Sequence, residues 1–267
     1  MTSPAPESAI TQTCTNCMKS LITFRKLRNR LLRETESTSN ALQVDMRRGL
    51  RWFEGRSHLY DRMLSASLGL LRSNGVFFDI GANIGWFSLR LCQDVRFSGT
   101  AHLFEPIPNL ADICRQLLGA IQCQTIVHNI ALGDVNEERN ILCDMDGNIG
   151  WNTLIEPMRT PNMVNLPVAV RRFDDLGIDT EPDLIKIDVE GAEDQVLRGM
   201  MESLRRWKRK PVILCEIGWG QSHPHWPDVI ATLQNVKALG YITVALDGSP
   251  LILHNITATV DALFLPH

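Results

Sequence analysis

The strongest constraint on the fold comes from one short segment, 76–85, which reads V-F-F-D-I-G-A-N-I-G. Its apolar start predicts a buried strand over 76–80, and apolar residues at helical spacing after Gly85 predict a helix over 84–93. Because glycine has no Cβ and tolerates positive φ, Gly81 and Gly85 would let a ligand approach bare backbone. The free N–H groups and partial positive charge of the helix start would add to such a site.

The glycine turn does not have the sequence of a phosphate site. No lysine follows Gly85, as a P-loop requires, and G-A-N-I-G does not match G-x-G-x-x-G. Asp79 would repel a pyrophosphate and attract a cationic amino group, although it could instead cap the helix. A strand over 100–105 ends in Glu105, where nucleotide-binding sheets place the carboxylate that accepts ribose hydroxyls. Two carboxylates around this turn predict a pocket for S-adenosylmethionine, an adenosyl group with a cationic amino-acid tail.

Bulk properties narrow the class of protein. The 267 residues are 44% apolar, which predicts one sizeable core, and a net charge of −3 makes nucleic acid an unlikely partner. No apolar run reaches 18 residues, so no membrane span is expected. The start of the chain lacks the basic and apolar regions of a signal peptide, and seven scattered cysteines suggest reduced thiols. These features together predict a cytoplasmic location.

The residues before the glycine turn are predicted to form a separate N-terminal part. Residues 1–17 read as a disordered tail, and 18–75 read as a helical extension with helices over about 40–54 and 57–72. This extension is expected to act as a lid, to contact the acceptor or to hold two chains together as a homodimer. Residues 76–267 form the predicted catalytic domain.

Strands and helices alternate from residue 76 onward, which predicts an α/β fold with a mostly parallel sheet covered by helices on both faces. The last two strands are expected to form an antiparallel edge like a hairpin. Further helices are predicted over 108–119, 191–206 and 226–239. Further strands are predicted over 125–131, 140–144, 167–173, 183–187, 211–216, 241–246 and 260–265.

Four motifs occur in a characteristic order, and together they resemble the FkbM-type S-adenosylmethionine-dependent methyltransferases. They are D-I-G-A-N-I-G from Asp79, F-E-P from Phe104, N-I-A-L-G from Asn129 and D-L-I-K-I-D-V-E-G-A-E from Asp183. The resemblance covers residue 76 to the C-terminus. It implies a class I, Rossmann-like methyltransferase fold of seven strands with the last one antiparallel. It also implies methyl transfer, usually to oxygen and often on secondary metabolites or sugars, as in natural product biosynthesis.

Residues at the carboxyl ends of the first strands are the candidates for cofactor binding, because open parallel sheets bind ligands there. We expect the glycine turn near the methionine tail, Glu105 at the ribose and the segment 129–132 near the adenine. The predicted cofactor residues are Asp79, Gly81, Ala82, Asn83, Gly85, Glu105, Asn129, Ala131 and Leu132.

Residues after the strands 183–187 and 211–216 are the candidates for catalysis. A hydroxyl acceptor needs a base or a metal, and two carboxylates at one strand end can raise one another's pKa or share a cation. The predicted catalytic residues are Asp188, Glu190, Glu216, His223 and His225, and Asp188 and Glu216 are the candidate ligands for Mg²⁺ or another divalent cation. Alternatively, Asp188 and Glu190 cap the helix over 191–206 and pair with Lys186 or Arg198.

Three functions stay open at this point. The first is O-methylation of a hydroxyl on a small secondary metabolite or sugar. The second keeps the fold but methylates a nitrogen on a peptide or amino group. The third is a non-catalytic module that binds S-adenosylmethionine or RNA, supported only by the basic segments 19–33 and 205–210, which lack interleaved aromatic residues.

Overall fold

The computed structural model describes residues 41–67, 69–94, 97–119, 121 and 123–267. The predicted tail (1–17) and the first part of the predicted extension lie outside the described residues. The described chain begins with two helices, α2 (Met46–Glu54) and α3 (Ser57–Ser67). Helix α2 starts at Asp45, whose carboxylate accepts a hydrogen bond from the backbone N–H of Arg48 at 2.9 Å, as a helix N-cap does.

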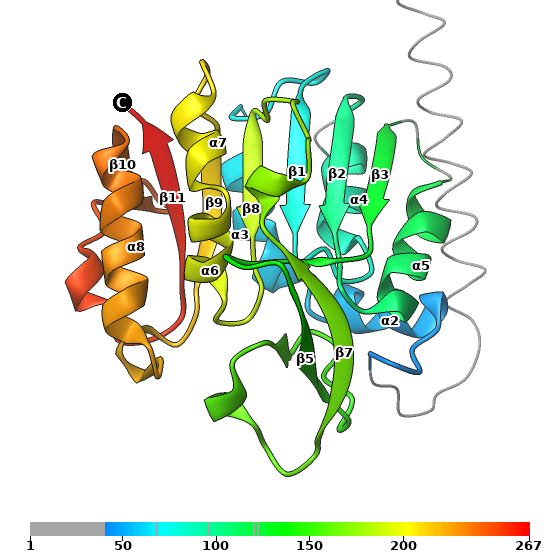
Figure 1. The fold of residues 1–267 in the computed structure, drawn as a ribbon. Helices are drawn as coiled ribbons and strands as arrows, with labels where there is room; N and C mark the ends of the chain where they lie inside the picture. The colour runs from blue at the N-terminus through cyan, green and yellow to red at the C-terminus, as the bar shows by residue number, and fades with distance from the viewer. Residues whose placement is uncertain (1–40, 68, 95–96, 120, 122) are drawn as a thin grey trace, which may run out of the picture.

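The main sheet has seven strands in the order β10-β11-β9-β8-β1-β2-β3 (Figure 1). Six of these strands run in the same direction, and β11 lies between β9 and β10, antiparallel to both. The predicted α/β fold, with seven strands and the last one antiparallel, is therefore confirmed. The strands are β1 (Val76–Ile80), β2 (Thr100–Phe104), β3 (Gln124–His128), β8 (Leu184–Ile187), β9 (Val212–Ile217), β10 (Tyr241–Ala245) and β11 (Val260–Pro266).

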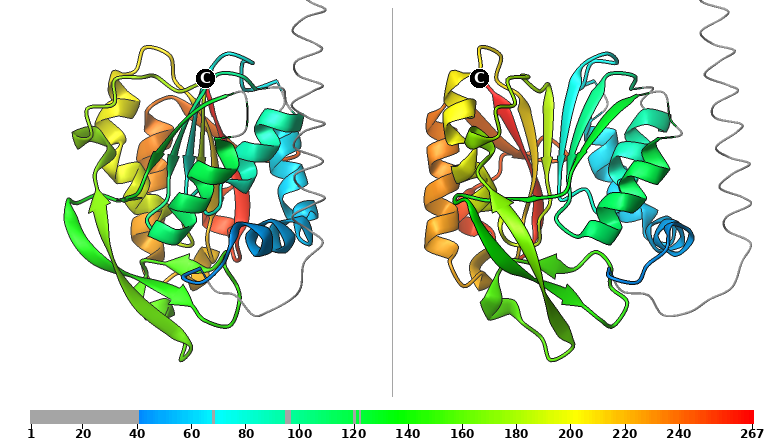
Figure 2. Two further views of the ribbon diagram at one scale, coloured as in Figure 1. Left: turned by 90° about the vertical axis from the view of Figure 1, so that its right-hand side faces the viewer. Right: turned by 45° about the vertical axis from the view of Figure 1, so that its right-hand side comes forward.

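Helices cover both faces of this sheet, as Figure 2 shows. One face packs against α6, α7 and α8, and the other against α3, α4 and α5, and each side has its own buried apolar cluster. Apolar strands buried on both faces are what a parallel sheet requires. The helices are α4 (Trp86–Asp94), α5 (Pro108–Leu118), α6 (Glu193–Gly199), α7 (Met201–Arg206) and α8 (Trp226–Ala238). Short 3-10 turns occur at Glu156–Met158, Phe173–Asp175, Gly220–Ser222 and Leu253–Asn255.

A second, smaller sheet lies beyond the carboxyl ends of the parallel strands (Figure 1). Its order is β4-β7-β5-β6, and the long antiparallel pair β5–β7 forms an arm below the main sheet. The strands are β4 (Ala131–Leu132), β5 (Glu137–Asp144), β6 (Asn152–Thr153) and β7 (Met163–Arg171).

The prediction of one strand over 125–131 is wrong, because the chain leaves the main sheet after His128. The Asn129 side-chain amide donates hydrogen bonds to the carbonyls of Glu105 and Pro106, both at 2.9 Å, and Ala131 then pairs with β7 of the second sheet. The strand predicted over 140–144 is the end of the longer β5. The strand predicted over 167–173 overlaps β7, which starts earlier, at Met163, and ends at Arg171.

The prediction of one helix over 191–206 is also wrong. The helix breaks at Met200, where φ is −118° and ψ is 11°. Gly199 lies so close to the loop after β4 that a Cβ on it would meet the Gly133 carbonyl oxygen at 1.8 Å. Beyond the break, the Asp174 carboxylate accepts the backbone N–H groups at the start of α7. Contacts with two distant loops therefore divide the helix.

The helices α2 and α3 pack against the rest of the molecule. Leu50, Phe53, Met63 and Leu64 are buried in the same apolar cluster as α4 and α5, and Phe53 stacks on Trp86 with ring centroids 6.0 Å apart. The apolar face of these two helices is thus used within the chain. A homodimer through the N-terminal helices stays a prediction.

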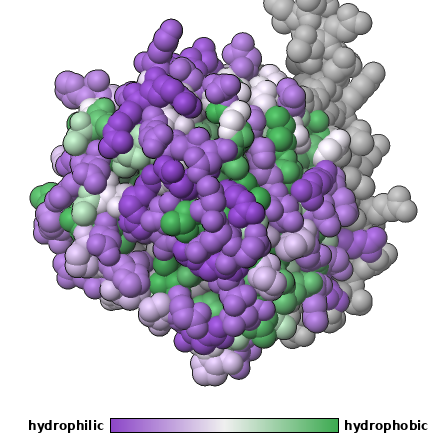
Figure 3. Space-filling view, in the orientation of Figure 1, coloured by the Kyte–Doolittle hydropathy of each residue, from purple (hydrophilic) through white to green (hydrophobic). Residues whose placement is uncertain are grey.

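The surface in the orientation of Figure 1 is mostly polar, with apolar residues in small groups (Figure 3). Among the described residues, no helix has both the length and the apolar character that crossing a membrane requires.

Two histidines stack between the strands at the edge of the main sheet. The rings of His102 in β2 and His128 in β3 have centroids 5.4 Å apart, and Nδ1 of His102 lies 3.2 Å from Nε2 of His128. Such a contact needs one N–H donor and one bare acceptor nitrogen, so it favours neutral rings. Burial, and then the neighbouring His128, lowers the pKa of His102 to about 4.

We expect the free energy of unfolding to rise with pH between about pH 4 and pH 6.5. An unfolded histidine has a pKa of about 6.5, so in this window the unfolded chain binds a proton that native His102 excludes, which contributes at most about 1.4 kcal/mol per pH unit. Urea denaturation at several pH values across the window measures the slope. The variant His102→Phe keeps a ring but cannot titrate, so its slope should be shallower, and an identical slope would contradict the assignment.

Candidate active site

A cavity lies at the carboxyl ends of β1, β2 and β8, bordered by the second sheet and by α2 and α3. Its empty space is about 800 Å³, counted with the open solvent at its mouth. The predicted site residues that line it are Gly81, Ala82, Asn83, Glu105, Ala131, Leu132, Asp188 and Glu190. The predicted residues that do not line it are Asp79, Gly85, Asn129, Glu216, His223 and His225.

The glycine turn after β1 brings two loops into contact. Gly81 has a φ of +76°, and a Cβ on it would lie 1.9 Å from the backbone oxygen of Asp188. Only glycine therefore allows the loops after β1 and β8 to meet at this point. Gly85 has a different role, because it packs beside Leu118 and Cys114 of α5 and not against the cavity.

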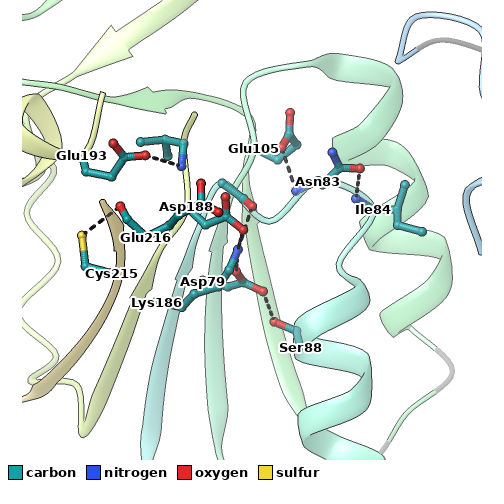
Figure 4. A network of polar contacts seen from close by, with 12 residues as sticks. Asp79, Asn83, Ile84, Ser88, Glu105, Lys186, Asp188, Glu193, Cys215 and Glu216 are labelled. Carbon is teal, nitrogen blue, oxygen red and sulfur yellow. Dashed lines mark hydrogen bonds and ion pairs between the residues drawn. The ribbon is translucent and has the colours of Figure 1, made fainter. Parts of the chain in front are cut away.

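Glu105 holds the glycine turn in place from the tip of β2. Its carboxylate oxygens accept the backbone N–H groups of Asn83 and Ile107, each at 2.8 Å (Figure 4). Burial raises the pKa of Glu105 to about 7, although these two hydrogen bonds act in the opposite direction. Asn83 has a φ of +53°, and its side-chain amide donates to the Ile149 carbonyl at 2.7 Å, which ties the turn to the second sheet.

Asp79 lies beneath the cavity and faces Lys186. It is fully buried; one carboxylate oxygen accepts the Ser88 hydroxyl at 2.6 Å, and the other lies 3.4 Å from Lys186 Nζ (Figure 4). Lys186 Nζ also lies 3.2 Å from Asp188 and donates to the Gly81 carbonyl at 3.2 Å. Burial lowers the pKa of Lys186, but Asp188 and Asp79 outweigh it and raise this pKa overall, so Lys186 stays charged.

Three carboxylates gather at the ends of β8 and β9. Each of Asp188, Glu190 and Glu216 offers an oxygen atom within 4.8 Å of the others, and Figure 4 shows Asp188 and Glu216 side by side. Burial first, and the charge of Asp188 second, raise the pKa of Glu190 to about 9 and that of Glu216 to about 10. Asp261, opposite Glu216 in the sheet, has its pKa raised to about 6 by the same two causes. Such a group holds protons at neutral pH and shares them.

The loop that carries Glu190 has an unusual backbone. Glu190 has a φ of +55°, which is uncommon for a residue with a side chain, and Gly191 follows at +97°. Glu193 holds this turn, because its carboxylate accepts the N–H groups of Val189 at 3.2 Å and Gly191 at 3.0 Å. Neither Asp188 nor Glu190 caps α6, whose N-cap is Ala192. Backbone strain of this kind is concentrated at functional sites.

His223 is engaged in backbone contacts. Its Nε2 donates to the Gly191 carbonyl at 2.7 Å and its Nδ1 accepts the N–H of His225 at 3.0 Å, which defines a neutral ring with both nitrogens occupied. Burial lowers its pKa, consistent with this state. Its ring also stacks on Trp219 at 5.5 Å. Within the described part of the chain, neither histidine belongs to a group of three metal-ligating side chains.

Part of the cavity wall comes from residues that the sequence did not single out. Phe53 and Tyr60 come from α2 and α3, and Ile141 and Leu154 come from the second sheet and the loop after it. Motifs did not point to them, because a single aromatic or aliphatic residue on a helix reads as core packing. Gly150, which also lines the cavity, packs closely on Trp52, because a Cβ on Gly150 would lie 2.8 Å from the Trp52 ring.

The fold and the cavity define the class of protein. The seven-stranded order, with β11 antiparallel between β9 and β10, is the arrangement implied by class I S-adenosylmethionine-dependent methyltransferases. The family model described as the methyltransferase FkbM domain matches residues 79–243. The chain belongs to this family and is an S-adenosylmethionine-dependent methyltransferase, which favours an enzyme over a non-catalytic module.

Solved structures give more distant similarities. A TehB-like methyltransferase from Corynebacterium glutamicum is 12% identical, with 82% of this chain and 96% of that chain covered, at a TM-score of 0.45. The methyltransferase PaMTH1 from Podospora anserina, bound to S-adenosylhomocysteine, is also 12% identical, with 98% and 97% covered, at a TM-score of 0.40. No curated protein matched the sequence.

Proposed function

We propose that this chain transfers the methyl group of S-adenosylmethionine to a hydroxyl of a small-molecule acceptor, such as a secondary metabolite or sugar. The observation that carries the proposal is the carboxylate group of Asp188, Glu190 and Glu216 at the cavity. A hydroxyl is a poor nucleophile at neutral pH and must lose its proton as it reacts, so it needs a base beside it. The raised pKa values of Glu190 and Glu216 suit proton acceptors.

The shape of the cavity supports the cofactor's place. Gly81, Ala82 and Asn83 present backbone at the tip of β1, and Glu105 lies at the tip of β2, where a carboxylate accepts ribose hydroxyls. Ala131 and Leu132 add an apolar wall that suits an adenine ring. Asp79 lies beneath the cavity and supports it indirectly, because it forms an ion pair with Lys186, which in turn bonds to the Gly81 carbonyl in the glycine turn. When bound, S-adenosylmethionine supplies a methyl group that its sulfonium already activates.

The chain's own residues would align and deprotonate the acceptor. Displacement at a methyl group needs the acceptor oxygen in line with the breaking bond, and alignment of this kind lowers a barrier by roughly 7–11 kcal/mol. Lys186 holds Asp188 in position, and Glu190, which lines the cavity, takes the acceptor's proton when it is ionised. His223 fixes the Gly191 turn instead of acting as the base.

Methylation of an amine is the second candidate. The carboxylates of Asp188, Glu190, Glu216 and Asp261 outnumber the buried Lys186, and such a group would also attract a protonated nitrogen. A panel of small alcohols, sugars, amines and short peptides, assayed by release of S-adenosylhomocysteine, separates the candidates. Turnover with hydroxyl compounds alone supports the proposal, and turnover with amines alone replaces it.

We expect the rate of methyl transfer to a hydroxyl to rise with pH between about pH 7 and pH 9. A base must be ionised to act, and Glu190 and Glu216 have pKa values raised to about 9 and about 10. The check is kcat/KM against pH for a hydroxyl acceptor from the panel. Glu190→Gln should lower kcat by about 100-fold or more while S-adenosylhomocysteine affinity changes less than about twofold. A rate that falls across this range would contradict the assignment.

A divalent cation is an alternative way to activate the hydroxyl. Asp188 and Glu216, together with Glu190, offer oxygen ligands of the type that Mg²⁺ prefers, and a bound cation would lower the acceptor's pKa. Assays after EDTA treatment and after addition of Mg²⁺ distinguish the two routes. An unchanged rate in both contradicts the metal, whereas a loss with EDTA that Mg²⁺ restores supports it.

A further inference from the structure

Tyr60 lies at the cavity although it comes from outside the segment that matches the family. The family model covers residues 79–243, and Tyr60 is carried by α3, in the N-terminal part of the chain. Its ring lines the cavity and packs on Phe53, with ring centroids 5.5 Å apart. Helix α3 itself is anchored by Met63 and Leu64, which are buried in the core. The ring is thus held by packing, and its position is set by the fold.

Charged residues of the cavity act on Tyr60. Tyr60 lines the same cavity as Lys186, Asp188 and Glu190, and the charges of these residues act on its phenol. Burial first, and Asp188 second, raise the pKa of Tyr60, so the phenol keeps its proton. A protonated phenol both donates and accepts a hydrogen bond.

The hydroxyl of Tyr60 has no partner in the described part of the chain. Its ring packs on Phe53 and against the apolar core, and phenylalanine would provide this packing equally well. A hydroxyl without a protein partner on the wall of a cavity, beside the rings of Phe53, Trp86 and Phe87, points to a polar ligand.

We propose that Tyr60 is an acceptor-positioning residue, whose hydroxyl hydrogen-bonds the polar group that stands where the methyl group is delivered. This inference rests on the proposed function, because it assumes that the cofactor occupies the cavity with its methyl group toward the carboxylates. The N-terminal helix α3 then supplies part of the acceptor site. Tyr60 forms no covalent bond and takes no proton; it orients the nucleophile toward the base.

Two cofactor analogues test this without knowledge of the acceptor. S-adenosylhomocysteine lacks the methyl group, and sinefungin carries a protonated amine on the carbon that replaces the sulfonium, so its amine projects toward the acceptor end. In calorimetric titration, Tyr60→Phe should raise the dissociation constant of sinefungin by about tenfold, the effect of one lost hydrogen bond to a charged group. The dissociation constant of S-adenosylhomocysteine should change by less than about twofold.

The chain offers a matched control, because it has only two tyrosines. Tyr241 in β10 also has a buried hydroxyl without a hydrogen bond, but it does not line the cavity. Tyr241→Phe should change neither affinity by more than about twofold. Thermal unfolding of both variants separates a binding effect from a loss of fold.

Each outcome decides the matter. A selective loss of sinefungin affinity in Tyr60→Phe supports the inference. Equal losses of both analogues, or no loss of either, overturn it, because a packing role or no role would then explain the residue. Failure of the wild-type chain to bind S-adenosylhomocysteine overturns the cofactor placement as well, and with it the proposed function, so the two failures are distinguishable.

Discussion

Replacement of Glu105 by alanine should raise the dissociation constant for S-adenosylhomocysteine by about 100-fold or more. In the proposed complex this carboxylate accepts both ribose hydroxyls, and in the structure it already holds the N–H groups of Asn83 and Ile107. Hydrogen bonds to a charged group contribute about 1.5–3 kcal/mol each, and about 1.4 kcal/mol corresponds to a tenfold change in affinity. Loss of the ribose contacts and of the anchored turn therefore accounts for a large effect.

Calorimetric titration measures the Glu105 effect, and two variants control it. Glu105→Gln keeps the volume and one acceptor oxygen, so its loss of affinity should be smaller than that of Glu105→Ala. Glu138→Ala, in β5, removes a carboxylate whose side chain is 66% exposed and should change the affinity less than about twofold. Thermal unfolding of each variant without ligand shows whether the substitution destabilises the whole fold or only changes ligand binding. Unchanged affinity in Glu105→Ala would disprove the ribose assignment.

Replacement of Lys186 by methionine should lower the free energy of unfolding by about 3–5 kcal/mol, the effect of breaking a buried ion pair. Lys186 is 3% exposed and lies between Asp79 and Asp188, at 3.4 Å and 3.2 Å. Without the ammonium group, two carboxylates would face each other in the core with no compensating charge. The loss of the bond to the Gly81 carbonyl would also loosen the contact between the loops after β1 and β8.

Urea denaturation measures the Lys186 effect. The double variant Asp79→Asn with Lys186→Met removes one of the facing charges, so it should be more stable than Lys186→Met alone by at least about 1 kcal/mol. Lys237→Met, at an exposed position on α8, should change stability by no more than about 0.5 kcal/mol. If Lys186→Met changed the free energy of unfolding no more than Lys237→Met does, the buried ion pair would contribute little, and the description of this part of the site would be wrong.

The boundaries of strands that depend only on neighbouring residues were predicted accurately. The strands at 76–80 and 100–105 are β1 and β2, to within one residue, because apolar runs bounded by glycine and proline depend only on neighbouring residues. The errors occur where distant contacts decide the backbone. The chain leaves the main sheet after His128 because Asn129 bonds to the loop after β2, and a close approach to Gly133 breaks the helix at Met200.

The candidate site was predicted unevenly for a related reason. Gly81 and Glu105 lie in motifs at strand ends, and the topology of a parallel sheet brings strand ends together, so both line the cavity. His223 was predicted as a catalytic residue from its residue type and its place after the strand 211–216. Whether a histidine is free depends on the partners of its two nitrogens, and here the Gly191 carbonyl and the N–H of His225 occupy both.

The sequence by itself determined the fold class and the kind of enzyme, since the motifs from Asp79 to Glu193 are contiguous stretches that carry the pattern of the family. Only the tertiary structure decided that Lys186 lies between two aspartates and that α3 brings Tyr60 to the wall of the cavity. Gly81 and Lys186, which meet at 3.2 Å, are 105 positions apart in the chain. No local pattern encodes such a pair, because the packing of the whole sheet and its helices brings the two residues together.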